Sequence, residues 1–164
     1  MGQGYRFVCK KCDCLYFASY GIGMMYPQAY RKLLEEIENG KYGKEWQQLL
    51  KDNPYAAVNA EIIVYICKEC GHWETGQDIT LYAPNNPDSI PKKQYGIKTI
   101  EEWGYVPYVT ASDLKEEYHV LKHYYHKCSK CGKRMHKASD DEIQHLPCPK
   151  CGTENEAEGG LLWD

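Results

Sequence analysis

Nine cysteines are the residues of this chain whose type and spacing point most directly to chemistry. They form four pairs with the same gap of two residues, which leaves only Cys14 over. A gap of two residues lets one tight turn aim both thiolates at a single ion, so two such turns complete a tetrahedral site of four sulfurs, which suits zinc. The odd count and the polar start of the chain argue against disulfides. The predicted ligands are Cys9 and Cys12, Cys67 and Cys70, Cys128 and Cys131, and Cys148 and Cys151.

The residues that follow the pairs fit such turns. Gly71, Gly132 and Gly152 come directly after the second cysteine of their pairs, and Asp13 takes this place in the first pair. Glycine adopts a positive φ without strain and Asp tolerates it, so the turn can direct backbone N–H groups at the sulfurs. The sequence therefore predicts four turns of one kind.

On these residues the chain resembles the zinc-ribbon superfamily, whose rubredoxin-like knuckles have the form C-x-x-C-G. The segments 128–132 and 148–152 match this form, and the resemblance covers about residues 118–164 best. The whole chain also resembles uncharacterised bacterial double zinc-ribbon proteins, a likeness that implies metal binding and names no activity. Because rubredoxins hold iron in the same geometry, an iron-containing electron carrier stands as an alternative to a protein with two zinc ions.

The order of the pairs along the chain suggests which of them share an ion. We predict one site from Cys9, Cys12, Cys67 and Cys70 and another from Cys128, Cys131, Cys148 and Cys151, with an interleaved cross-brace as the alternative. The first site closes a loop of 54 residues and the second a loop of 16. The longer loop costs only about 1 kcal/mol more closure entropy, against roughly 10–16 kcal/mol for binding a structural zinc ion.

The elements expected around the cysteines give a mixed architecture. Segments rich in β-forming residues predict the strands. Helical periodicity predicts the helices, and the first of them has Pro27 near its start and Asn39-Gly40 at its end. From Ser112 we expect a short helix followed by a strand. The other predicted strands are 5–8, 60–66 and 77–82, and the other predicted helices are 27–38 and 44–51.

The predicted fold class is α+β, with two small zinc ribbons of antiparallel hairpins. The first ribbon spans residues 1–83 and carries a helical insertion at about 27–52. A connecting loop region follows at 84–111, because prolines and asparagines gather at its beginning. The second ribbon spans 112–164.

Composition indicates an ordinary soluble protein, with 43% hydrophobic and 26% charged residues. The longest apolar run, Ile62 to Cys67, is far shorter than the ~20 residues of a membrane span. We therefore predict a cytoplasmic protein with no membrane contact, in a compartment that keeps its thiols reduced.

Two kinds of partner suit the remaining features. Lys130, Lys133, Arg134 and Tyr124 combine charge with a ring that stacks, as in proteins that bind single-stranded nucleic acid. The net charge of −3 disfavours phosphate binding, so contact with a protein partner or a second copy is the preferred interpretation. The flexible apolar stretch at residues 21–26, with Met24 and Met25, is the candidate surface for such contact.

Catalytic signatures are missing from the sequence: it has no H-E-x-x-H motif, no phosphate-binding loop and no G-x-S-x-G motif. A closed tetrathiolate site also leaves no position for a reactive water. We predict a non-catalytic binding module. Glu116, His119 and His123 would share a face only if the helix from Ser112 continued through them. Cys14 is interpreted as a spare thiol, either a small buried residue or a redox-sensitive one.

Overall fold

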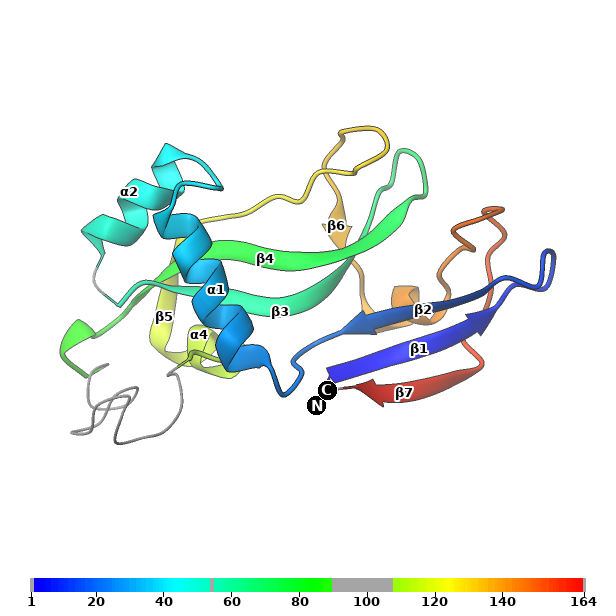
Figure 1. Cartoon of the computed structure of the whole chain (residues 1–164), viewed down its shortest axis with the longest axis horizontal. Helices are drawn as coiled ribbons and strands as arrows, with labels where there is room; N and C mark the ends of the chain where they lie inside the picture. The colour runs from blue at the N-terminus through cyan, green and yellow to red at the C-terminus, as the bar shows by residue number, and fades with distance from the viewer. Residues whose placement is uncertain (1, 54, 90–107, 164) are drawn as a thin grey trace. The chain divides into compact units, whose positions relative to one another are not determined.

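The structure is a computed structural model that describes residues 2–53, 55–89 and 108–163. It is an α+β fold, as predicted, with one sheet ordered β2-β1-β7 and another ordered β5-β4-β3-β6, both antiparallel (Figure 1). The elements are β1 Gly2–Val8, β2 Leu15–Tyr20, α1 Tyr26–Glu38, α2 Lys44–Asp52, β3 Ala57–Ile66, β4 Trp73–Pro84, the 3-10 helix η1 Pro87–Ser89, α4 Ala111–Glu117, β5 Tyr118–Lys122, β6 His136–Lys137, α5 Asp140–Gln144 and β7 Gly159–Trp163.

The chain forms two compact units, and neither is a continuous segment. The first, which we call the knuckle unit, contains the described parts of 1–24, 61–77 and 125–164. The second, the helical unit, contains those of 25–60 and 78–124. The long strands β3 and β4 run through both units, so the division differs from the predicted order of 1–83, 84–111 and 112–164. The helical insertion predicted at 27–52 lies wholly in the helical unit, and residues 90–107 of the predicted connecting region lie outside the described residues.

The sheet of β2, β1 and β7 joins the two ends of the chain (Figure 1). Gly2 lies opposite Trp163 in the pairing of β1 with β7, and the Trp163 indole Nε1 donates a hydrogen bond to Gln3 O at 2.8 Å. A Cβ on Gly2 would stand 2.2 Å from the Trp163 ring, so only glycine fits beneath it. The C-terminal strand is therefore an integral part of the sheet on which the first cysteine pair is mounted.

One face of this sheet is the core of the knuckle unit. Phe7 and Tyr16 are buried, and their rings stack with centroids 4.8 Å apart. Leu146 and Ile143 are also buried in this cluster. Phe17 alternates to the opposite face and is 51% exposed. The alternation follows from the period of two residues in a strand.

Four elements of the knuckle unit were missing from the sequence-based expectations: β2, β6, α5 and β7. Of these, α5 has a local signal that could have located it. Ser139 and Glu142 form a capping box, in which the serine hydroxyl accepts from the Glu142 N–H and the carboxylate accepts from the Ser139 N–H. The S-x-x-E pattern is a known start signal for helices.

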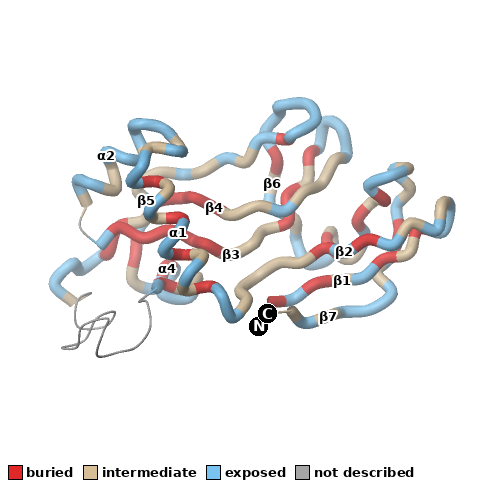
Figure 2. The backbone as a smooth tube through the Cα atoms, viewed as in Figure 1, coloured by how far each residue is buried: buried red, intermediate tan, exposed pale blue. Residues whose placement is uncertain are grey.

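The helical unit confirms the predicted helices. Pro27 lies at the start of α1, and Tyr30, Leu33 and Ile37 are buried along one face of it. In α2, Trp46 donates a hydrogen bond from Nε1 to Ile79 O at 2.8 Å. Figure 2 shows buried stretches on β3 and β4, which correspond to residues 57–60 and 78–81.

The helix and strand predicted from Ser112 are also present, as α4 and β5. α4 begins at a capping box of Thr110 and Asp113, and it ends at Glu117, where β5 starts. β5 pairs with β4 and belongs to the helical unit. Residues 112–124 therefore lie in the helical unit, whereas the predicted division grouped them with residues 125–164.

Two phenylalanines on opposite faces of the first sheet test this description of the core. Phe7→Ala should lower the free energy of unfolding by ~3–5 kcal/mol, because a buried ring is lost and its space is only partly refilled. Phe17→Ala removes the same atoms from an exposed site and should cost about 1 kcal/mol or less. Urea denaturation of the metal-loaded variants measures both values. Equal losses for the two variants would mean that the faces are wrongly assigned.

Candidate metal centres

Each of the four C-x-x-C pairs forms the same knuckle. In every knuckle, the N–H of the residue after the second cysteine donates to the carbonyl of the first cysteine, at 2.8–2.9 Å. That residue has a positive φ in all four, including 53° at Asp13, and the predicted turn is therefore confirmed. A second bond runs from the N–H of the first cysteine to a carbonyl five residues later: Cys9 to Cys14, Cys67 to His72, Cys128 to Lys133 and Cys148 to Thr153.

The knuckles meet in two groups of four thiols, and both groups lie within the knuckle unit. In each group the four sulfurs all lie within 4.8 Å of one another. We call them the outer and inner sites, after their positions along the chain. The outer site consists of Cys9, Cys12, Cys148 and Cys151, and the inner site consists of Cys67, Cys70, Cys128 and Cys131.

This grouping corrects the predicted pairing. The first knuckle pairs with the fourth and the second with the third, so the arrangement is neither the sequential one nor the interleaved one. The pairing of β1 with β7 brings the two ends of the chain together. The pairing of β3 with β6, where Ile66 lies opposite His136, brings the middle knuckles together.

Entropy does not oppose this nested arrangement strongly. The two sites close loops of 135 and 57 residues, in place of the 54 and 16 residues of the sequential arrangement. Because closure entropy grows with the logarithm of loop length, the difference is roughly 2 kcal/mol. Strand pairing and core packing outweigh a term of this size, so loop length was a poor guide to the partners.

The sulfur positions fit a tetrahedral metal ion. A tetrahedron with metal–sulfur bonds of about 2.3 Å has sulfur–sulfur edges of about 3.8 Å. Across the outer site, the sulfurs of Cys9 and Cys151 are 3.5 Å apart and those of Cys12 and Cys148 are 3.7 Å apart. The inner site has 3.5 Å for Cys67 with Cys131 and 3.6 Å for Cys70 with Cys128. All nine cysteines are free thiols in the structure. Each group could hold one metal ion.

The same hydrogen bond joins the partner knuckles in both sites. The residue four positions after the second cysteine of one knuckle accepts a hydrogen bond from the N–H that follows the first cysteine of the other. In the outer site, Asn155 Oδ1 accepts from Lys10 N at 3.0 Å. In the inner site, Glu74 Oε1 accepts from Ser129 N at 3.1 Å. The two sites therefore share one hydrogen-bonding arrangement, in which the acceptor is a side-chain amide in the outer site and a carboxylate in the inner site.

The tie of the outer site is buried. Asn155 is 2% exposed, and its Nδ2 donates to Thr153 O at 2.7 Å and to the Tyr16 hydroxyl at 3.2 Å. That hydroxyl in turn donates to Leu146 O at 2.7 Å. These hydrogen bonds connect both knuckles of the outer site to the buried core and fix their positions.

The tie of the inner site is a group of ionisable side chains. Glu74 also contacts His126 Nε2 at 3.0 Å, His72 Nε2 at 3.3 Å and the Ser129 hydroxyl. The His126 ring stacks on Tyr65 with centroids 4.2 Å apart. Burial raises the pKa of Glu74, but the bonds from Ser129 and His126 outweigh it and the pKa is lowered. His72 is thus engaged with this network, and four thiolates complete the site without it.

The pKa values of two thiols in the outer site are shifted in opposite directions. The backbone N–H of Cys14 lowers the pKa of Cys12, but burial and the neighbouring thiols outweigh it and raise the pKa to about 12. Contact with Thr153 lowers the pKa of Cys151 to about 6. Because four thiolates this close repel one another, repulsion favours protonated thiols when no metal is bound. A dication that binds to the four sulfurs must therefore displace protons.

The predicted nucleic-acid residues are divided between the two units. Lys130, Lys133 and Arg134 are exposed on the third knuckle and its hairpin. Tyr124 belongs to the helical unit, where its N–H donates to Thr80 Oγ1 at 3.0 Å. The next residue, Tyr125, is 49% exposed and has the Arg134 guanidinium 3.5 Å from its ring centroid. The strand bridge between Lys127 and Arg134 brings the Arg134 side chain close to Tyr125.

The other candidate residues fall in separate places. His119 lies on β5, where its Nδ1 is 3.0 Å from Asn85 Oδ1, and no metal-type group in the described residues includes it or Glu116 and His123. Cys14 is half-buried, and its thiol lies 3.8 Å from Leu15 O. Burial raises the pKa of Cys14.

An open groove of about 280 Å³ runs beside knuckles of both sites. Lys130 and Lys150 are exposed on its walls, which Trp73, Pro147 and Pro149 complete. Among the described residues that line it there is no carboxylate. The lysines favour an anion here, while the negative charge of two tetrathiolate centres opposes it.

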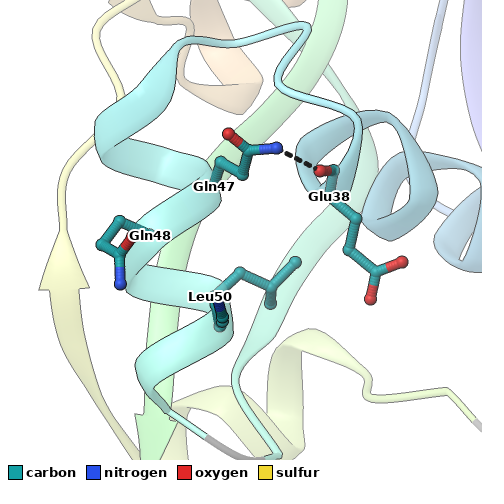
Figure 3. A pocket seen from close by; sticks show the side chains of 5 residues that line it. Glu38, Gln47, Gln48 and Leu50 are labelled. Atoms are coloured by element: carbon teal, nitrogen blue, oxygen red, sulfur yellow. Dashed lines mark hydrogen bonds between the residues drawn. The ribbon is translucent and has the colours of Figure 1, made fainter.

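A second hollow, of about 470 Å³, lies between α1 and α2 in the helical unit (Figure 3). Gln47 reaches across it, and its Nε2 donates to Glu38 O at 2.7 Å. Glu38, Gln48 and Lys51 are exposed around it, and only Leu50 is half-buried. The lining is a solvated helix surface and gathers no reactive groups.

Comparison with known proteins returned no relatives: no family model, curated protein or solved structure matches the chain. None of the helices in the described residues combines the length and apolar character needed to cross a membrane.

The nested pairing predicts different metal contents for two double variants. Cys12→Ser with Cys151→Ser removes two ligands from the outer site only, so the chain should keep one ion. Cys12→Ser with Cys70→Ser removes one ligand from each site and should weaken both. Native mass spectrometry in the presence of a mild chelator measures the ions that remain. Sequential pairing requires the reverse pattern, because Cys12 and Cys70 would then share a site.

Proposed function

We propose that this chain is a non-catalytic, cytoplasmic zinc protein whose knuckle unit is a double zinc ribbon held by two structural ions. The observation that carries the proposal is the arrangement of the sulfurs, four at each site, with contacts near the edge length of a metal tetrathiolate. The knuckle hydrogen bonds, which repeat in all four turns, support it. A reducing compartment follows because thiolate ligands must stay unoxidised.

The closed coordination argues against a catalytic role for the ions. A catalytic zinc keeps a fourth position for water, whereas each site here offers four thiolates. Their function is then to fasten segments that are far apart in the sequence. The inner site needs such fastening because its hydrophobic cluster is small. So few buried side chains supply little stabilisation without a metal ion, and they are Tyr65, Cys67, Cys128 and Met135.

Metal analysis of the purified protein tests the zinc proposal. We expect two zinc ions per chain, a colourless solution and loss of structure when a strong chelator removes the metal at neutral pH. A red protein with thiolate-to-iron absorption and a reversible one-electron step would instead identify the rubredoxin-like alternative. Folded protein with one ion or none would contradict the proposal.

As a binding module, the chain is proposed to contact a protein partner or a second copy. Met24 and Met25 support this, since they are 72% and 62% exposed at the start of α1. Exposed methionines adapt their shape to a partner, and burying them on contact is favourable.

A specific feature also favours a second candidate, the binding of single-stranded nucleic acid. The Arg134–Tyr125 pair presents a ring and a cation together, and three lysines lie on the same hairpin at 127, 130 and 133. No ion pair is recorded for these lysines or Arg134 within the described residues. Stacking platforms beside unneutralised cations are the features that single-strand binders use.

Removal of the hairpin cations separates the two candidates. If the chain binds single strands, replacing three of the hairpin cations by Gln should weaken the binding and reduce its dependence on salt. A titration of labelled single-stranded DNA and RNA at about 0.15 M salt, the physiological screening regime, measures this. The control changes three exposed lysines of the helical unit in the same way. The test set is Lys130, Lys133 and Arg134, and the control set is Lys32, Lys44 and Lys51.

Replacement of Met24 and Met25 by Ser is the complementary test. Under the protein-contact proposal it should reduce self-association in sedimentation analysis, or capture of a partner, while the metal content and thermal unfolding stay unchanged. Micromolar or tighter nucleic-acid binding that depends on the hairpin cations and not on these methionines would reverse the order of the two candidates.

A further inference from the structure

The two metal sites share their ligands and hydrogen bonds but differ in their access to solvent. Both begin from two buried cysteines, Cys9 and Cys148 in the outer site and Cys67 and Cys128 in the inner site. The second cysteine of each knuckle differs between the sites. These are half-buried in the outer site, at Cys12 and Cys151, and exposed in the inner site, at Cys70 and Cys131.

Packing explains the difference. Cys12 and Cys151 lie against the large cluster that contains Phe7, Tyr16 and Leu146. The corresponding cluster of the inner site holds only Tyr65, Met135 and two of the ligands, with Ile63 at its margin. The second cysteines of the inner site therefore have no comparable cover within the described residues.

The ties between the knuckles differ in the same direction. The outer site is tied by Asn155, which is 2% exposed. The inner site is tied by Glu74, whose side chain is 21% exposed, to an exposed serine, Ser129. Water competes for hydrogen bonds at exposed positions, so the inner knuckles can separate locally at a lower cost.

We propose that Cys70 and Cys131 are the sites at which soft electrophiles modify this protein, and that the inner site is its exchangeable metal site. The inference rests on the proposed function, because it requires that both sites hold zinc. Coordinated thiolates remain nucleophilic, and access then decides which of them reacts first.

The chemistry of the modification is simple to state for a maleimide. The thiolate sulfur of Cys70 or Cys131 adds to the carbon–carbon double bond and forms a sulfur–carbon bond. The neighbouring carbon takes up a proton from water. The resulting thioether is a much poorer ligand than a thiolate, so the zinc loses one of its four bonds and leaves the site. No oxidant or reductant is consumed.

The groove beside the knuckles does not decide the order of reaction, because it borders both sites. Cys70 lines it, and so do Cys148 and Cys151. A small reagent therefore reaches the neighbourhood of both ions. What distinguishes the sites is the exposed surface of the sulfur-bearing residues themselves.

The test treats the zinc-loaded full-length protein with N-ethylmaleimide at neutral pH, with a chromogenic chelator present to report released zinc. Samples are quenched over time, and the modified cysteines are identified by peptide mass spectrometry. The same experiment on Cys14→Ser removes the uncoordinated thiol, whose modification alone would release no metal. Metal content is measured before the reagent is added.

We expect two phases of zinc release. The first ion should leave as Cys70 and Cys131 become modified, about tenfold or more faster than the second ion leaves with modification of Cys12 and Cys151. Far-UV circular dichroism should show that most secondary structure persists after the first phase.

Simultaneous loss of the two ions, or earlier modification of Cys12 and Cys151, would overturn the inference while leaving the zinc proposal intact. Protein that contains no metal before treatment would instead refute the zinc proposal, and the inference with it. The initial metal measurement distinguishes these two failures.

Discussion

The fold of the knuckle unit depends on bringing four thiolates from two distant knuckles to one point, and doing so twice. Each knuckle is a local turn that the chain can form alone, but a metal site needs two of them in register. The strands supply that register: β1 with β7 for the outer site and β3 with β6 for the inner site. Metal binding and strand pairing are therefore mutually dependent, as expected where a metal site is preformed only in the folded state.

Nesting also explains how the helical unit is built into the chain. Its segments are 25–60 and 78–124, and the chain passes between the units after β2, within β3, within β4 and after β5. The hairpin of β3 and β4 is continuous with the knuckle of Cys67 and Cys70. An ion at the inner site thus fixes the end of strands whose other halves lie in the core of the helical unit, where residues 57–60 and 78–81 are buried.

Local features of this protein could be predicted from sequence, whereas pairing across the chain could not. The cysteine ligands and the helices α1 and α2 follow from spacing and periodicity within a few residues. The nested grouping depends on β7, a short strand with two glycines that carries little β signal, and on Asn155 and Glu74, whose partners are more than fifty residues away. Loop entropy was the only available guide to the partners, and its differences of roughly 2 kcal/mol are too small to decide among them.

The nested connectivity is tested most directly by replacing zinc with cadmium-113 and recording cadmium–proton correlation spectra, which link each ion to the Cβ protons of its own four cysteines. The account predicts two cadmium resonances. One should correlate with Cys9, Cys12, Cys148 and Cys151, and the other with Cys67, Cys70, Cys128 and Cys131. A resonance that correlates with both Cys9 and Cys67 would contradict it.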